Sequence, residues 1–140
     1  MNSIDEILNS GELTLAMFGR GDLRVEMDLR AIRNMHQIQP HFFAACKKYN
    51  VESICATGFL ESMIPSDGEI QPSEIGDMLI SMRTGPDHLM LSAESSYGAQ
   101  AHKCIETECM YQRDIVKKLE SGEVSPLLPE GNLSELLYLS

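Results

Sequence analysis

The sequence has little positive charge, few aromatic residues and no long apolar run. Its 140 residues include no tryptophan, and only 6% are aromatic. No stretch approaches the roughly 20 consecutive apolar residues that a membrane-spanning helix requires. Lysine and arginine total 11 against 21 aspartates and glutamates, for a net charge of −10 at pH 7. This surplus of negative charge argues against direct binding to nucleic acid or to an anionic membrane, because both attract positive side chains.

Familiar catalytic and metal-binding motifs are also absent. The chain has no CxxC pair, no GxSxG or QACxG nucleophile motif and no helix-opening phosphate loop. The segment HKCIETEC at 102–109 holds one histidine and two cysteines, but five helical positions between the thiols turn them about 140° apart. We therefore predict no catalytic residue, no metal ligand and no cofactor, with Cys104 a small buried hydrophobic residue.

The cysteines and the first ten residues favour a reducing compartment. Cys46, Cys55, Cys104 and Cys109 are expected to be free thiols, since a chain of this length can build a core without disulfides. The opening MNSIDEILNS has no lysine or arginine and so lacks the basic region of a secretory signal. We expect a cytoplasmic protein.

Hydrophobic periodicity predicts a mixture of helices and strands. Apolar residues alternate over 13–17 and again over 23–29, and GRGD at 19–22 lies between them, which predicts a β-hairpin over about 12–30. On this interpretation GRGD is a hairpin turn and not a phosphate loop, which would need a strand-to-helix junction.

The rest of the chain alternates helices with weaker strands. Helical spacing predicts helices near 29–50 and 72–84 and a long C-terminal helix over about 96–120, with strands expected at 51–59 and 88–93. Together with the hairpin these predict a single α+β domain over residues 1–122. Residues 123–140 are expected to form a proline-containing apolar tail.

Negative charge is concentrated in one segment. From 49 to 82 there are six acidic residues and no lysine or arginine. Such a surface raises the encounter rate with a basic partner and fixes its orientation. The expected partner interface combines acidic and apolar residues: Glu61, Asp67, Glu69, Glu74, Asp77, Leu136, Leu137 and Tyr138.

These features predict a small acidic protein without catalytic activity that inhibits or chaperones another protein. A partner with a basic, nucleic-acid-binding surface would meet carboxylates in place of phosphates, which makes the chain a nucleic-acid mimic like the phage-encoded inhibitors of bacterial defence. The sequence is also compatible with a homodimer. One alternative is a redox or metal sensor built on cysteine and histidine, and a second is a small enzyme of unassigned reaction.

Overall fold

The structure, a computed structural model, describes residues 3–138, except for the side chains at positions 3, 30, 31, 134, 137 and 138. Helices and strands alternate along the chain. Their order is α1 (Ser3–Leu8), β1 (Leu15–Gly19), α2 (Arg20–Glu26), α3 (Leu29–Arg33), α4 (Met35–Lys48), β2 (Glu52–Ala56), η1 (Glu61–Met63), α5 (Pro72–Arg83), β3 (His88–Met90), α6 (Ala93–Ser96), α7 (Ala101–Glu120) and α8 (Leu133–Tyr138).

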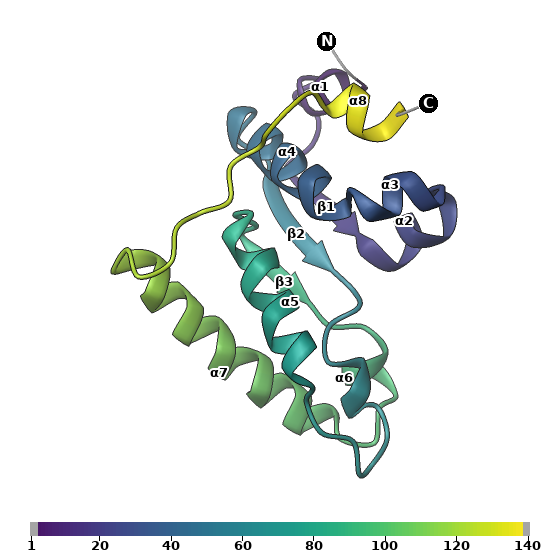
Figure 1. The fold of residues 1–140 in the computed structure, drawn as a ribbon, viewed down its shortest axis with the longest axis vertical. Helices are drawn as coiled ribbons and strands as arrows, with labels where there is room; N and C mark the ends of the chain where they lie inside the picture. Colours follow the sequence, from purple (N-terminus) through teal and green to yellow (C-terminus); the bar gives the residue numbers. More distant parts are fainter. Residues whose placement is uncertain (1–2, 139–140) are drawn as a thin grey trace.

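The three strands form a parallel sheet in the order β1-β2-β3. In its register Phe18 lies level with Cys55, and Cys55 lies level with Leu89. Parallel neighbours need long crossover connections, which here contain α4 between β1 and β2 and α5 between β2 and β3. Figure 1 shows the sheet in the middle of the molecule, with α5 and α7 side by side. All strand carboxyl ends therefore meet at one edge of the sheet.

One face of the sheet packs against the helices and forms the core. Phe18 and Cys55 on this face are buried together with Phe43 and Met78 from the crossover helices. The rings of Phe18, Phe42 and Phe43 stack with centroids 5.3–5.9 Å apart. Burying a side chain of this size contributes about 1.5–3 kcal/mol, so the cluster anchors β1 and β2 to α4.

The other face of the sheet is open. Leu15 and Met17 on β1 point away from the core and remain 46% and 50% exposed. Because β1 and β3 stand at the ends of the strand order, each also has one edge without a hydrogen-bonded neighbour among the described residues. Large apolar side chains beside an unpaired edge usually mark a surface that another element covers.

The predicted mixture of helices and strands in one small domain is confirmed, but the predicted hairpin over 12–30 is wrong. Its first strand exists as β1, whereas residues 20–26 form α2. Leu23 and Met27 pack against the core at the i, i+4 spacing of a helix, while Val25 is 82% exposed. The apolar residues that alternate over 23–29 therefore include a pair at helical spacing, Leu23 and Met27. The sheet is parallel and not antiparallel.

The later helices agree better with the sequence. The helix predicted near 72–84 is α5, and the long C-terminal helix is α7, which begins at Ala101 and not near 96. Beyond α7 the chain passes back over the domain: the Leu127 N–H donates to the Arg83 carbonyl at 2.7 Å, and Leu133 is buried in the core. Within residues 3–138, no helix combines the length and apolarity needed to cross a bilayer.

Candidate functional site

The GRGD segment lies where β1 passes directly into α2. β1 ends at Gly19 and α2 begins at Arg20, so GRGD lies at a strand-to-helix junction and the predicted hairpin turn is wrong. At the same edge of the sheet, Thr57 follows β2 and Ser92 comes just after β3. In folds built on parallel strands, binding and catalytic groups gather at the carboxyl ends of the strands. This edge is therefore the candidate active site.

Arg20 ties the ends of β1 and β2 together. Its Nε donates to the Thr57 carbonyl and its Nη2 donates to the Gly58 carbonyl, both at 2.9 Å. The guanidinium also lies over the Phe59 ring, 3.9 Å from the centroid, in the geometry of a cation–π contact. The backbone at 57–58 is thus held by the side chain of the first residue of α2.

The remaining donors of Arg20 engage α5. Nη1 donates to Asp77 Oδ1 at 2.8 Å and to Ser81 Oγ at 3.1 Å, and Nη2 lies 2.8 Å from Asp77 Oδ2. The Arg20 side chain is only 12% exposed. With every nitrogen of its guanidinium occupied, Arg20 is a structural pin and not a free cation for a ligand.

Thr57 adopts a backbone conformation that its side chain disfavours. Its φ is +69°, in the left-handed region where β-branched residues are rare and the cost is about 1–3 kcal/mol. The Gly21 N–H donates to Thr57 Oγ1 at 2.8 Å, and a Cβ at position 21 would approach that oxygen to 3.0 Å. Since Oγ1 accepts from Gly21, the Thr57 hydroxyl hydrogen can donate to a ligand at this edge.

Two carboxyl groups lie at the same edge of the sheet. Asp22, in the first turn of α2, is exposed beside an apolar pocket of about 430 Å³ formed by residues from α1, β1, α2 and α4. Glu94 on α6 is buried and accepts the Ser92 N–H at 2.7 Å. In the described part of the chain, no group of three or more Asp, Glu, His or Cys residues could hold a metal ion.

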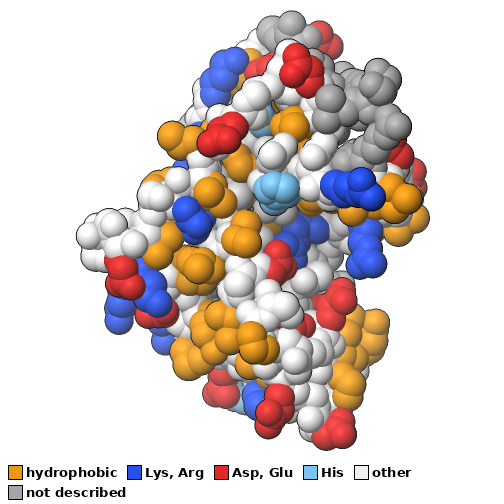
Figure 2. Space-filling model, viewed as in Figure 1, with side chains coloured by type: hydrophobic (Ala, Val, Ile, Leu, Met, Phe, Trp, Pro, Cys, Tyr) orange, Lys and Arg blue, Asp and Glu red, His pale blue; other side chains and the backbone are white. Residues whose placement is uncertain are grey.

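The five acidic residues predicted to bind a partner differ in their surroundings. Glu61, Asp67 and Glu69 are exposed on η1 and the loop after it, whereas Asp77 is bound to Arg20. Glu74 is partly buried, and its carboxylate accepts hydrogen bonds from backbone N–H groups. Figure 2 shows acidic side chains interspersed with basic and hydrophobic ones on the visible face.

Glu74 closes the first turn of α5. Its carboxylate accepts the Gln71 N–H at 2.8 Å and the Ser62 N–H at 2.9 Å. Burial opposes ionisation of Glu74, but hydrogen bonds from Gln71 and Ser62 outweigh it and lower the pKa. This acid therefore has a structural function in α5.

The predicted apolar part of the interface lies on α8. Leu136 is half-buried against the core and its carbonyl accepts from Asn34 Nδ2 at 3.3 Å. The side chains of Leu137 and Tyr138 lie outside the described residues.

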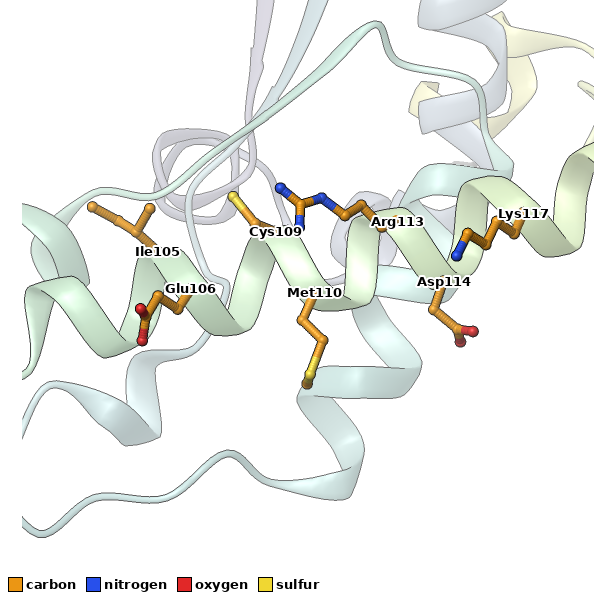
Figure 3. Close-up of a pocket in the computed structure, with 7 residues that line it drawn as sticks. All are labelled: Ile105, Glu106, Cys109, Met110, Arg113, Asp114 and Lys117. Carbon is orange, nitrogen blue, oxygen red and sulfur yellow. The ribbon is translucent and has the colours of Figure 1, made fainter.

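The segment HKCIETEC lies on α7, with Cys104 buried as expected. His102 pairs with Glu106 at 3.1 Å on the exposed side. Figure 3 shows a hollow beside Cys109 whose seven lining residues all belong to α7. With no second element to close it, this hollow is an exposed helix surface.

Sequence reasoning missed Arg20, Gly21 and Thr57. The signal available was the order of elements: predicted strands at 51–59 and 88–93 flank a predicted helix at 72–84, which is typical of parallel pairing. Parallel pairing would have directed attention to the residues after each strand.

Comparisons with known proteins agree on one family. Residues 1–105 match the family model described as "Pyruvate kinase, barrel domain". The chain is 30% identical over 111 residues to pyruvate kinase isozyme G, chloroplastic, of Nicotiana tabacum, covering 79% of this chain and 19% of the relative. It is 32% identical over 104 residues to the pyruvate kinase of Thermotoga maritima, covering 74% of this chain and 22% of the relative.

A solved structure shows the same fold. A pyruvate kinase from Cryptosporidium parvum superposes with a TM-score of 0.68 at 24% identity, over 79% of this chain and 21% of that chain. This chain therefore spans about a fifth of the length of the proteins that it resembles.

These matches overturn the function expected from composition. The hypotheses of a non-catalytic inhibitor or chaperone, of a nucleic-acid mimic and of a basic protein partner are wrong, because the chain matches a domain of a metabolic enzyme. Net negative charge excludes some ligands, but it does not identify a reaction.

Proposed function

The chain belongs to the pyruvate kinase barrel-domain family, and from this we propose that it acts as part of an enzyme that transfers a phosphoryl group between a nucleotide and the enol oxygen of pyruvate. The observation that carries the proposal is the Arg20 pin, which fixes Gly21 and Thr57 at the carboxyl edge of a parallel sheet. Phosphoryl transfer depends chiefly on positioning and electrostatic stabilisation, and a rigid edge of this kind provides positioning.

The Thr57 hydroxyl is the group best placed to contact substrate. Pyruvate carries a carboxylate, and a hydroxyl donor held in one position can orient it. Arg20 cannot serve this purpose, since its donors are engaged by Thr57, Gly58, Asp77 and Ser81. The strained φ of Thr57 fits this assignment, because such strain concentrates at functional sites.

Kinases generally use divalent metal ions bound through carboxylates and substrate phosphates. The described residues of this chain do not supply such a site by themselves, since they contain no group of three donors.

The open sheet face indicates how the chain fits into the larger enzyme. A closed β/α barrel has eight strands with a side-chain-filled interior, whereas this sheet has three. We propose that further barrel strands pair with the free edges of β1 and β3 and cover Leu15 and Met17. The chain's coverage of about a fifth of its relatives supports this arrangement.

A segment exchange tests the proposed function. The matching segment of the Thermotoga maritima pyruvate kinase is replaced by residues 1–105 of this chain, and nucleotide-dependent phosphoryl transfer involving pyruvate is measured. We expect activity, and we expect Thr57→Ala to lower kcat/KM about tenfold, the equivalent of one hydrogen bond of about 1.4 kcal/mol. Thr14→Ala, exposed near the opposite edge, is the matched control. A chimera that folds by circular dichroism and is inactive would refute the proposal.

The compartment is a separate proposal. We propose a cytoplasmic location; the relatives from Nicotiana tabacum and Arabidopsis thaliana are named chloroplastic or plastidial. Imaging of a tagged copy in its native cell distinguishes the two.

A further inference from the structure

Two carboxyl groups are buried where α6 meets α7. Glu94 on α6 is 1% exposed and Glu108 on α7 is 8% exposed. Glu94 accepts the Ser92 N–H, but Oε1 of Glu108 is buried and has no hydrogen-bond partner within the described residues. A buried carboxylate without compensation is costly, so some species must neutralise this pair.

Among the described residues, no lysine, arginine or histidine forms an ion pair with Glu94 or Glu108. On α7, Gln112 bonds Glu108 and the buried thiol of Cys104 lies one turn earlier. The exposed Lys103 instead donates to Gln100 Oε1 at 3.2 Å. Burial raises the pKa of Cys104, and the negative charges of Glu94 and of Glu74 on α5 add to this increase.

A metal ion is also disfavoured as the neutralising species. The described residues contain no group of three donors that could hold one, and a metal needs several ligands. A proton needs only one oxygen. Consistent with this, burial raises the pKa of Glu108, the negative charge of Glu94 adds to the increase, and the hydrogen bond from Gln112 opposes it.

We propose that Glu94 and Glu108 form a proton-linked latch in which a proton on Glu108 holds α6 against α7. Deprotonation of Glu108 places two negative charges in the buried junction between α6 and α7. The repulsion between them weakens the packing that holds residues 91–100 in place. This segment leads away from the carboxyl end of β3. It is also held by the Ala99 N–H, which donates to the Ile64 carbonyl at 3.0 Å, and by Gln100 Nε2, which donates to the carbonyls of Met63, Pro65 and Gly68 at 2.6–3.3 Å. The latch concerns opening of this segment and stands whether or not the proposed function is correct.

The direction of the pH dependence follows from linkage. A carboxyl whose folded-state pKa is raised contributes stability that is fully present below its unfolded value, here about 4.5. That contribution is lost as pH rises through the folded-state pKa. Between the two values the opening equilibrium of residues 91–100 should rise about tenfold per pH unit for one linked proton.

Hydrogen exchange of the purified chain tests the latch. Amide exchange in residues 91–100 is measured by mass spectrometry from pH 5 to pH 8 and corrected for intrinsic rates. We expect protection to fall with pH in the wild type and to become independent of pH in Glu108→Gln, which keeps the size of the side chain. Glu106→Gln, two residues away on the exposed side of α7, should behave as the wild type. Equal pH dependence in wild type and Glu108→Gln would overturn the latch.

A second measurement needs no variant. Carbon-13 NMR of glutamate side chains in the wild-type protein follows the titration of Glu108 directly. We expect its midpoint to lie above 4.5, the ordinary value for a glutamate. A midpoint at or below 4.5 would overturn the proposal even if Glu108→Gln failed to fold.

Discussion

At the scale of single residues, Arg20 joins more parts of the molecule than its position in the sequence suggests. A guanidinium has five N–H donors in a planar fork, and here they reach two backbone carbonyls after β2 and two side chains on α5. Periodicity cannot reveal such a contact, because the partners lie 37–61 positions away in the sequence. In the sequence alone, Arg20 lies between two glycines, a pattern that is typical of an exposed turn.

We expect Asp77→Asn to destabilise the chain by about 1–2 kcal/mol in urea unfolding. The substitution leaves the guanidinium of Arg20, which is nearly buried, without its anion, and unpairing a buried charge is costly. The 40% exposure of Asp77 limits the loss. Asp67→Asn, an exposed loop position, should change stability by less than about 0.5 kcal/mol. A loss at Asp77 no larger than this control would argue against the pin.

We expect Cys109 to react first with iodoacetamide in the native protein. Burial raises the pKa of Cys55 to about 11, and burial together with Asp87 raises that of Cys46 to about 11. Only about 0.1% of such a thiol is thiolate at pH 8, and the thiolate is the nucleophile. Cys109 is the one cysteine that is not buried. Peptide mapping at pH 8 should show it modified first, and Cys109→Ser should remove the fast phase; early labelling of Cys55 would contradict the packing.

At the scale of elements, helices were predictable where a capping signal and an apolar stripe coincide. Pro72 and Glu74 open α5, and Met78 and Leu79 from its apolar stripe pack into the core. The segment after Gly19 satisfied both a strand pattern and an i, i+4 pair, and only the core contacts of Leu23 and Met27 decide for the helix. Local pattern is a weak guide when two periods fit the same residues.

We expect Glu74→Gln to cost about 1–2 kcal/mol at pH 7, because the α5 cap loses a charged acceptor. The lowered pKa of Glu74 means that its contribution is present above about 4.5 and is lost as pH falls through the folded-state pKa. Thermal unfolding between pH 3 and pH 7 should therefore show a weaker acid dependence in the variant. Glu69→Gln, exposed in the preceding loop, should retain the wild-type profile; an unchanged profile in Glu74→Gln would contradict the capping function.

At the scale of the whole molecule, composition indicated a mixed domain but not the reaction. The acids between 49 and 82 are one segment in sequence, yet Asp77 and Glu74 turn to intramolecular partners while Asp67 faces water. The parallel order of strands, which locates the site, depends on crossovers that bring distant segments together. Such long-range pairing leaves little trace in a local window of sequence.

The open face of the sheet yields a prediction about the complete barrel. In the isolated chain Met17 is half exposed, so Met17→Glu should cost less than about 1 kcal/mol in urea unfolding. In the Thermotoga maritima chimera the proposed barrel would place the same position in a filled interior, where an unpaired carboxylate should cost several kcal/mol. Val25 on α2 is 82% exposed, so Val25→Glu should be tolerated in both proteins. Because the two measurements differ only in what covers β1, a small cost of Met17→Glu in both would mean that no further strand lies over this face.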